Sequence, residues 1–588
     1  MNQVLLRLSF SIFLVFGFIG TSYFFSFYIT ELRADERETW LNEKAWNITN
    51  KLTEEELVGQ TIHIAIPSKT VETIATEEIQ KTKPGGIILF GKNLGKKSEI
   101  ISLTSNLQKT ASSEGLQPFL ISTDQEGGRV FRVQDGITEY PGAMAVGQTG
   151  KEEWGKTVGF VTSYELKELG INFLFAPILD INNNPLNPVI NTRSFGSDAT
   201  RVSRVAVAYE QGARLGGALP VIKHFPGHGD TNVDSHLGLP VIKKTLTELE
   251  QLELVPFKKA IDSGAEAVMT AHIVYPLIDE KYPATLSKKI LTGILREKLK
   301  FNGIIITDAM EMHAISKNYE KDRPGVLAIL AGANIVLLTS WGDTARRFKE
   351  QLSDAYAKGD FFVTDADGKK RDLLKEAVFK QIRKKLEMGL YSQDPPILSI
   401  YSENENIKEF LAKKEETRNL KYKELTEQGN FLKNITNDSI RAYPNVFSPP
   451  KNTKNTTLSL VKNIHLKKSL DGKGIQSTTA KQLAKTISAK GISHILIDSS
   501  SEKEILNIAN LAKKYPNKHF VVLHGGTPFV RLPVLPNLNY LLSFSLTSHS
   551  WEALGDKYTG GEEVPKVDLI LLPKDSKTPS KGAFPEAL

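Results

Sequence analysis

The chain has 588 residues, of which 40% are hydrophobic and 24% are charged, and its formal net charge is +7. This length allows two or three domains, and the ordinary globular composition excludes wholesale disorder. The lysines are scattered and form no basic block interleaved with aromatic residues, so we expect no nucleic-acid partner. The chain contains no cysteine, which excludes disulfide bonds, thiolate metal ligands and a cysteine nucleophile.

The N-terminal segment is apolar and aromatic from Leu8 to Ile29, with Arg7 before it and Glu31 after it. About 22 residues at about 1.5 Å each are enough to cross a bilayer. The aromatic run at 24–28 stands where a signal-peptide cleavage site would need small residues. We therefore expect residues 1–35 to be an uncleaved signal anchor, with a cleaved signal peptide as the alternative. The body of the protein is expected to be exported and attached to the membrane by this segment.

Beyond a helical lead-in at 38–60, apolar strand-like runs alternate with amphipathic helical stretches. The runs lie at 62–66, 86–90, 119–122, 173–178, 220–223, 267–270, 304–307 and 334–338, and helices are expected at 152–169, 201–215, 246–263 and 288–300. Eight buried strands alternating with helices predict parallel βα units, and the count favours a (β/α)8 barrel of the TIM type over residues 36–391. In such a barrel, function lies on the loops beyond the carboxyl ends of the strands.

A break at Asp394-Pro395-Pro396 begins a charged, helical linker at 392–424, and a second α/β unit is expected over 425–588. Its strand candidates are 458–461, 494–497, 520–523, 540–544 and 569–572, with helices at 480–489 and 501–514. The fold class is therefore α/β, with a barrel followed by a smaller α/β domain.

Asp308 ends the seventh run, a nearly pure β-branched strand. A carboxylate held there by a rigid strand at the mouth of a barrel suits a nucleophile or a general base. The alternative is an aspartate that caps the following helix.

The stretch 223–236 after the fifth run carries three histidines and two aspartates. Asp234 and His236 are two positions apart, so they point the same way in an extended loop, and the carboxylate can fix one imidazole nitrogen while the other exchanges a proton. Gly227 and Gly229 suggest an arm able to close over a substrate. A metal site remains an alternative, with His224, His228, Asp230, Asp234 and His236 as its ligands. We favour acid/base chemistry without a metal or other cofactor, because Lys223 beside His224 is awkward next to a dication.

Further polar residues follow the same strand ends. Asp124, with Arg132 and Arg193, forms a charged set suited to sugar hydroxyls. Lys223 and His224 leave their strand on opposite faces, and both reach a substrate only if the strand bulges there. Glu126 is more easily explained as a brace for its loop than as a catalytic group.

These motifs resemble the signature of bacterial β-N-acetylglucosaminidases of glycoside hydrolase family 3. The resemblance covers roughly 52–389 and rests on four stretches: Lys223 to His236 with Pro240, Asp124 to Val130, Arg193 to Gly196, and Thr307 to Met312. More weakly, the part after Tyr391 is similar to the α/β-sandwich second domain of two-domain members.

The resemblance implies a role for each residue. Asp308 would be the nucleophile and His236, partnered by Asp234, the acid/base. The residues implied to bind N-acetylglucosamine are Asp124, Arg132, Arg193, Lys223 and His224. The expected activity is retaining, exo-acting hydrolysis of terminal β-linked N-acetylglucosamine from cell-wall-derived glycans or muropeptides. A glycoside phosphorylase or broader β-glycosidase on the same scaffold, and a metal-dependent hydrolase, remain as alternatives.

Overall fold

The computed structural model describes residues 35–235, 237–365, 367–392, 404–427, 429–449, 457–488, 491–560 and 562–567. The apolar segment expected to anchor the chain, position His236 and the last strand candidate at 569–572 lie outside these residues. Within the described ranges, no helix combines the length and the hydropathy needed to span a bilayer.

Two parallel sheets form the scaffold of the larger part of the chain. One has the strand order β11-β1-β2-β3-β6-β7 and the other β10-β9-β8. The strands are β1 (Ile62–Ala65), β2 (Gly86–Ile88), β3 (Leu120–Thr123), β6 (Phe173–Leu174), β7 (Leu219–Pro220), β8 (Ile222–Phe225), β9 (Ala267–Thr270), β10 (Ile304–Ile306) and β11 (Val336–Leu337). Parallel bridges at Ile178–Lys223 and Ile306–Ile335 connect the two sheets. The predicted runs are therefore strands of a parallel α/β fold, and the fifth run is divided into β7 and β8.

The side chains of these strands alternate between two apolar clusters. Ile304 and Ile306 of β10 belong to a central cluster to which β1, β2, β3, β6, β7, β9 and β11 also contribute, whereas Ile305 packs against the surrounding helices. Successive residues of a strand point to opposite faces, so a strand that is apolar at every position is buried on both sides. This explains the unbroken apolar runs in the sequence.

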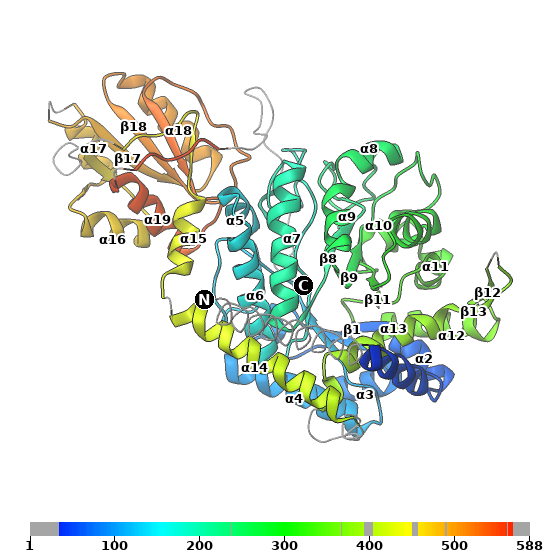
Figure 1. Ribbon diagram of the computed structural model, residues 1–588. Coiled ribbons are helices and arrows are strands. Elements are labelled where there is room, and N and C mark those ends of the chain that lie inside the picture. The colour runs from blue at the N-terminus through cyan, green and yellow to red at the C-terminus, as the bar shows by residue number, and fades with distance from the viewer. Residues whose placement is uncertain are drawn as a thin grey trace, which may run out of the picture.

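Helices surround the strands (Figure 1). They include α4 (Lys97–Ser113), α6 (Glu152–Glu168), α7 (Ala199–Gly216), α8 (Leu246–Gln251), α9 (Leu254–Asp262), a π-helical segment (Lys289–Lys298), α11 (Pro324–Ala331), α12 (Asp343–Ala357) and α13 (Leu373–Glu387). The helix expected over 246–263 is two helices. α6 and α7 approach closely because glycines face the contact: a Cβ on Gly159 would lie 2.0 Å from the carbonyl oxygen of Tyr209.

Residues 405–427 form one long helix, α14 (Glu405–Glu427), as the charged helical pattern predicts. Its side chains contact α6, where the rings of Tyr422 and Tyr164 stack with centroids 4.2 Å apart and Glu415 pairs with Lys167 at 2.8 Å. The helix crosses beneath α6 in Figure 1.

The second α/β unit is built on a six-stranded sheet with the order β14-β19-β18-β17-β15-β16. Its strands are β14 (Arg441–Tyr443), β15 (Thr457–Leu460), β16 (Gln476–Ser477), β17 (His494–Ser499), β18 (His519–His524) and β19 (Leu538–Leu542), and its helices include α15 (Phe431–Ser439), α16 (Ile464–Gly472), α17 (Ala480–Thr486), α18 (Glu502–Lys514) and α19 (Ser548–Thr559). Val522 and Val521 lie in different apolar clusters, one on each face of the sheet.

The two units share apolar and polar contacts. Met144 and Ala145 of α5 (Ala143–Thr149), although they belong to the first unit, pack into an apolar cluster of the second. Asp438 of α15 accepts from both Lys151, at 2.7 Å, and the indole of Trp154, at 2.8 Å. The second unit is therefore packed onto the first.

Candidate active site

A cavity of about 510 Å³ lies beyond the carboxyl ends of the parallel strands. Six of the eight residues predicted to be catalytic or to bind the sugar line it: Asp124, Arg132, Arg193, Lys223, His224 and Asp308. They come from sequence positions almost two hundred residues apart and follow different strands. The expectation that the polar residues after the strand ends converge is confirmed.

Four charged groups on one wall neutralise one another. The Lys223 ammonium lies 2.6 Å from an Asp124 oxygen and 2.7 Å from a Glu126 oxygen. Glu126 also accepts two hydrogen bonds of 2.8 Å from the guanidinium of Arg193. Burial opposes charge on Glu126, but the two facing cations outweigh it and hold its pKa well below the ordinary value. Glu126 therefore stays ionised, and it braces Arg193 and Lys223.

Lys223 and His224 are neighbours in the chain, yet both line the cavity. The pairing of β8 with β9 shifts register between Ile222 and Phe225, and the peptide bond between Lys223 and His224 is cis. A regular strand would send the two side chains to opposite faces. The register shift is therefore the strand irregularity that the two side chains need in order to point into the same cavity.

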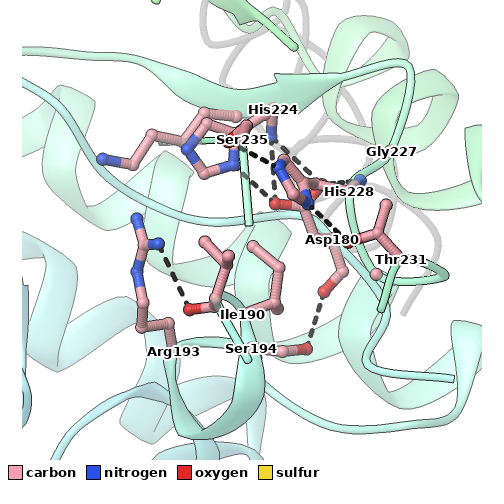
Figure 2. A network of polar contacts seen from close by, with 12 residues as sticks. Asp180, Ile190, Arg193, Ser194, His224, Gly227, His228, Thr231 and Ser235 are labelled. Carbon is pink, nitrogen blue, oxygen red and sulfur yellow. Dashed lines mark hydrogen bonds and ion pairs between the residues drawn. The ribbon is translucent and has the colours of Figure 1, made fainter. Parts of the chain in front are cut away.

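Asp180 organises the histidine side of the cavity (Figure 2). One carboxylate oxygen lies 2.7 Å from Nδ1 of His224, and the other accepts from the backbone N–H of His228 at 2.6 Å. Burial opposes charge on Asp180, but the facing imidazoles and the hydrogen bonds lower its pKa. With Nδ1 of His224 engaged, Nε2 is the ring nitrogen that can meet a ligand.

The ring of His228 is buried against the arm that follows β8. Its Nε2 lies 3.2 Å from the hydroxyl of Ser235 and its Nδ1 lies 3.3 Å from that of Thr231. Burial lowers the pKa of His228 to about 4, so the ring is neutral at physiological pH. His228 is therefore suited to holding the arm rather than to exchanging protons.

Asp308 is half-buried in the cavity wall, two residues beyond β10. One of its oxygens accepts from the N–H of Ala309 at 2.8 Å. The carbonyl of Ala309 in turn lies 2.9 Å from Nε2 of the buried His272. The contact with His272 thus helps to fix the backbone next to Asp308, as a positioned reactive group requires.

The arm carrying the expected acid/base reaches the cavity at Ser235 and Leu237, which both line it. Asp234 is buried, and its carbonyl accepts from the N–H groups of Leu237 and Gly238 at 2.9 Å each. Position His236 lies outside the described residues. The pairing of Asp234 with His236 therefore stays a prediction.

The metal alternative depends on the same arm. In the part of the chain that the structure describes, no group of three or more His, Asp and Glu side chains is arranged to hold a metal ion. Of the ligands proposed for it, His224 is bonded to Asp180, and Asp230 pairs with Lys244 at 2.8 Å.

Asp180 and the brace between Glu126 and Arg193 were not assigned from the sequence. Asp180 is the first acidic residue after the fourth run, so its position past a strand end was the available signal. A third feature comes from the second unit. Thr527 donates a hydrogen bond of 2.7 Å to the side chain of Asn191, a residue with a positive φ of 47° just before Arg193.

The chain is similar to known carbohydrate-active proteins. Residues 52–367 match the model of the glycosyl hydrolase family 3 N-terminal domain. The chain is 39% identical over 303 residues to a beta-hexosaminidase A of Pseudoalteromonas piscicida, covering 48% of this chain and 51% of that protein. It is 33% identical over 267 residues to a beta-hexosaminidase of Methylobacillus flagellatus, covering 44% of this chain and 75% of that one. The chain thus spans about half the length of the first relative and three quarters of the second.

Similarity to a solved structure extends over both units. A family 3 β-N-acetylglucosaminidase from Paenibacillus sp. str. FPU-7 superposes with a TM-score of 0.70 at 28% sequence identity. The superposition covers 88% of this chain and 98% of that one. The second α/β unit is therefore part of the likeness.

Proposed function

The chain belongs to glycosyl hydrolase family 3, and on this basis we propose that it is a retaining exo-β-N-acetylglucosaminidase. Its relatives are named beta-hexosaminidases, and the similar solved structure is a β-N-acetylglucosaminidase. The observation that carries the proposal is the half-buried Asp308 carboxylate in a cavity also lined by Asp124, Lys223 and Arg193, whose charges are paired with one another or with the buried Glu126.

In the proposed first step, Asp308 attacks the anomeric carbon of the bound sugar while the imidazolium of His236 protonates the leaving oxygen. Asp234 orients that ring and stabilises its charge. In the second step, neutral His236 removes a proton from water, which displaces Asp308 and restores the enzyme with the anomeric configuration retained. An imidazole suits this role because, once neutral, it does not repel the Asp308 carboxylate as a second carboxylate would.

Their place in the lining of the same cavity as Asp308 supports the assignment of sugar binding to Asp124, Arg132, Arg193, Lys223 and His224. Asp124 still offers acceptor capacity to hydroxyl groups, and the Nε2 of His224 is left for a ligand by the contact between Nδ1 and Asp180. Arg132 also lines the cavity, so its guanidinium is a donor available to a bound sugar.

The remaining expectations belong to the same proposal. The strands of residues 36–391 form a (β/α)8 barrel, residues 392–424 are a linker, and 425–588 are an α/β-sandwich domain. Residues 1–35 anchor the protein to a membrane, with the catalytic body exported to the periplasmic or extracellular side. The substrate there would be a glycan or muropeptide from the cell wall.

The proposal is tested first with nitrophenyl N-acetyl-β-glucosaminide, assayed with and without inorganic phosphate. Hydrolysis independent of phosphate is expected, and a rate that requires phosphate would instead identify a phosphorylase. NMR of the first product should show the β anomer, and an α anomer would refute the retaining mechanism.

The nucleophile is identified with a 2-fluoro analogue of the sugar, which slows the second step and traps the covalent intermediate. Digestion and mass spectrometry should find the label on the peptide that contains Asp308. A label on another carboxylate would refute this assignment while leaving the activity itself intact.

A further inference from the structure

A second cavity, of about 550 Å³, lies at the opposite ends of the same strands. Its lining includes Leu219, the first residue of β7, and Glu266, which directly precedes β9. The wall that closes it on the other side is α14, from Phe410 to Lys421. We call it the basic cavity, because seven of its lining residues are cationic: Lys156, Arg214, Lys384, Lys413, Lys414, Arg418 and Lys421.

The basic cavity is not neutralised by its own carboxylates. Its lining contains two acidic residues, Glu266 and Glu387, and Lys384 pairs with both, at 2.7 and 2.6 Å. Arg214 and Arg418 pair with glutamates on their own helices, at 3.2 and 2.7 Å. The remaining cations outnumber the carboxylates that face them.

Four lysines carry this excess. Among the described residues, no carboxylate forms a salt bridge with any of these lysines, which are Lys156, Lys413, Lys414 and Lys421. The ammonium groups of Lys414 and Lys421 lie instead over the rings of Phe410 and Phe160, at 5.2 and 5.8 Å from the centroids. Burial lowers the pKa of Lys414, so an anion that enters the cavity would relieve an unfavourable charge there.

The surroundings of the basic cavity are apolar as well as cationic. Leu215 in its lining is 50% exposed, and Leu420 on α14 is 63% exposed. Lysines and exposed leucines on one surface are the combination that binds at the interface of an anionic membrane. A small soluble anion would need the lysines alone.

The start of the described chain lies at this same surface. The guanidinium of Arg37 stacks on the ring of Phe410, 4.1 Å from its centroid, and Phe410 lines the basic cavity. Only residues 30–34 separate Asp35 from the apolar segment that ends at Ile29, and five residues reach at most about 17 Å. A bilayer that holds this segment would therefore be close to the cavity.

We propose that the basic cavity binds the phosphate headgroup of an anionic phospholipid of the membrane to which the chain is attached. The choice of a lipid as ligand rests on the membrane attachment in the proposed function. It does not rest on the catalytic assignment. Because the two cavities lie at opposite ends of the strands, headgroup binding would turn the mouth of the candidate active site away from the bilayer.

The absence of cysteine allows a direct test on the full chain, since Thr417→Cys in the cavity lining creates one attachment point for a polarity-sensitive fluorophore. The labelled protein is reconstituted in vesicles of phosphatidylcholine alone or with about one third phosphatidylglycerol. We expect a shift of the emission only with phosphatidylglycerol. Equal emission in both vesicles would overturn the proposal.

Soluble ligands then separate a lipid from a free anion. The labelled chain in neutral detergent is titrated with short-chain phosphatidylglycerol and, separately, with inorganic phosphate. Saturable binding of the lipid, with phosphate weaker by at least about tenfold, is expected because the apolar rim adds to the charge. Phosphate that binds as well as the lipid would show an anion site and refute the lipid assignment.

Charge reversal provides the matched comparison. Combining Lys413→Glu, Lys414→Glu and Lys421→Glu should weaken lipid binding by about 100-fold or more, whereas Lys467→Glu, Lys468→Glu and Lys503→Glu in the second unit should not. If the first variant is less stable, Lys413→Gln with Lys421→Gln should still weaken binding several-fold. Hydrolysis is measured on the same samples: inactive protein that binds the lipid refutes the proposed function alone, and active protein that does not bind it refutes this inference alone.

Discussion

The two cavities are of similar volume and lie at opposite ends of the same strands, but they differ in whether the charged side chains of their walls are paired. At the carboxyl ends, Asp124 and Glu126 face Lys223 and Arg193 in pairs. At the amino ends, a single lysine engages both carboxylates of the lining, both arginines pair with glutamates of their own helices, and four lysines form no salt bridge among the described residues. A wall of paired charges offers hydrogen bonds without a net field and suits a neutral sugar, whereas an unpaired excess suits an anion.

The strongest way to break this comparison is to remove the carboxylate that is expected to react. Asp308→Asn preserves the size of the side chain and an acceptor for the N–H of Ala309, so the fold should be retained. We expect kcat for nitrophenyl N-acetylglucosaminide to fall by at least about 1,000-fold, because a nucleophile has been lost. Activity within tenfold of the wild type, in protein shown by mass spectrometry not to have deamidated, would contradict the assignment.

The next largest effect should come from unpairing the neutral wall. Glu126→Gln leaves Arg193 and Lys223 with Asp124 as the remaining carboxylate, so kcat/KM should fall about 100-fold and the free energy of unfolding by about 3 kcal/mol. Asp343→Asn is the control, because Asp343 is fully exposed and its pair with Arg346 lies at the surface. That change should leave the denaturation midpoint almost unchanged, because water and salt screen a pair at the surface. Equal effects of the two substitutions would show that the buried ion pairs of Glu126 contribute no more to activity and stability than a surface pair does.

A smaller effect is expected from pH, through the buried ring of His228. Its pKa in the folded protein is about 4 and the ordinary value is 6.5, so the unfolded chain takes up the proton more readily. The contribution to stability is complete above pH 6.5 and is lost as pH falls towards 4, by about 3 kcal/mol in total. Chemical denaturation of His228→Asn between these pH values should show a shallower loss.

His63 is the natural comparator for this series. Its ring is fully buried in β1, away from the arm, and burial lowers its pKa to about 3. It adds to the acid slope in wild type and in His228→Asn alike, so only part of the slope should disappear. An unchanged slope in His228→Asn would mean that this ring is not held neutral.

The smallest effect should be that of salt on sugar binding, which can be compared directly with the effect of salt on lipid binding at the other cavity. KM for a neutral sugar should change by less than about twofold between low and high salt, since the charges of the active-site wall are buried and paired. Binding of anionic lipid at the other cavity should weaken steeply over the same range. Similar salt dependence of the two ligands, measured in parallel titrations, would remove the distinction between the cavities.

Much of the first unit could be predicted from the sequence because its strands are short, apolar on both faces and separated by amphipathic helices. The site could be predicted in outline for the same reason: Asp124 and Asp308 stand just beyond the ends of β3 and β10, and parallel strands bring such ends together. The sequence showed that Lys223 and His224 could both point inward only if their strand were irregular. No local residue pattern predicted that the irregularity, a register shift, would be present.

Other features had no local signal. Glu126 and Arg193 are sixty-seven positions apart, and their pairing depends on how two loops meet. The basic cavity draws on helices α6, α7, α13 and α14, with lysines that look like ordinary surface charge when each helix is considered alone. The edge strand β14 and the short β16 are too brief to give a periodic pattern.

The hydrogen bond from Thr527 to Asn191 links the loop that carries Arg193, in the first unit, to the second unit. Together with Met144 and Ala145, which pack into the neighbouring unit, it couples their unfolding equilibria. A sugar bound in the first unit should therefore raise the melting temperature of both units, because the free energy of binding stabilises every part that unfolds together with the site. In a calorimeter, a ligand that touches only the first unit should then move a single endotherm rather than split it into two.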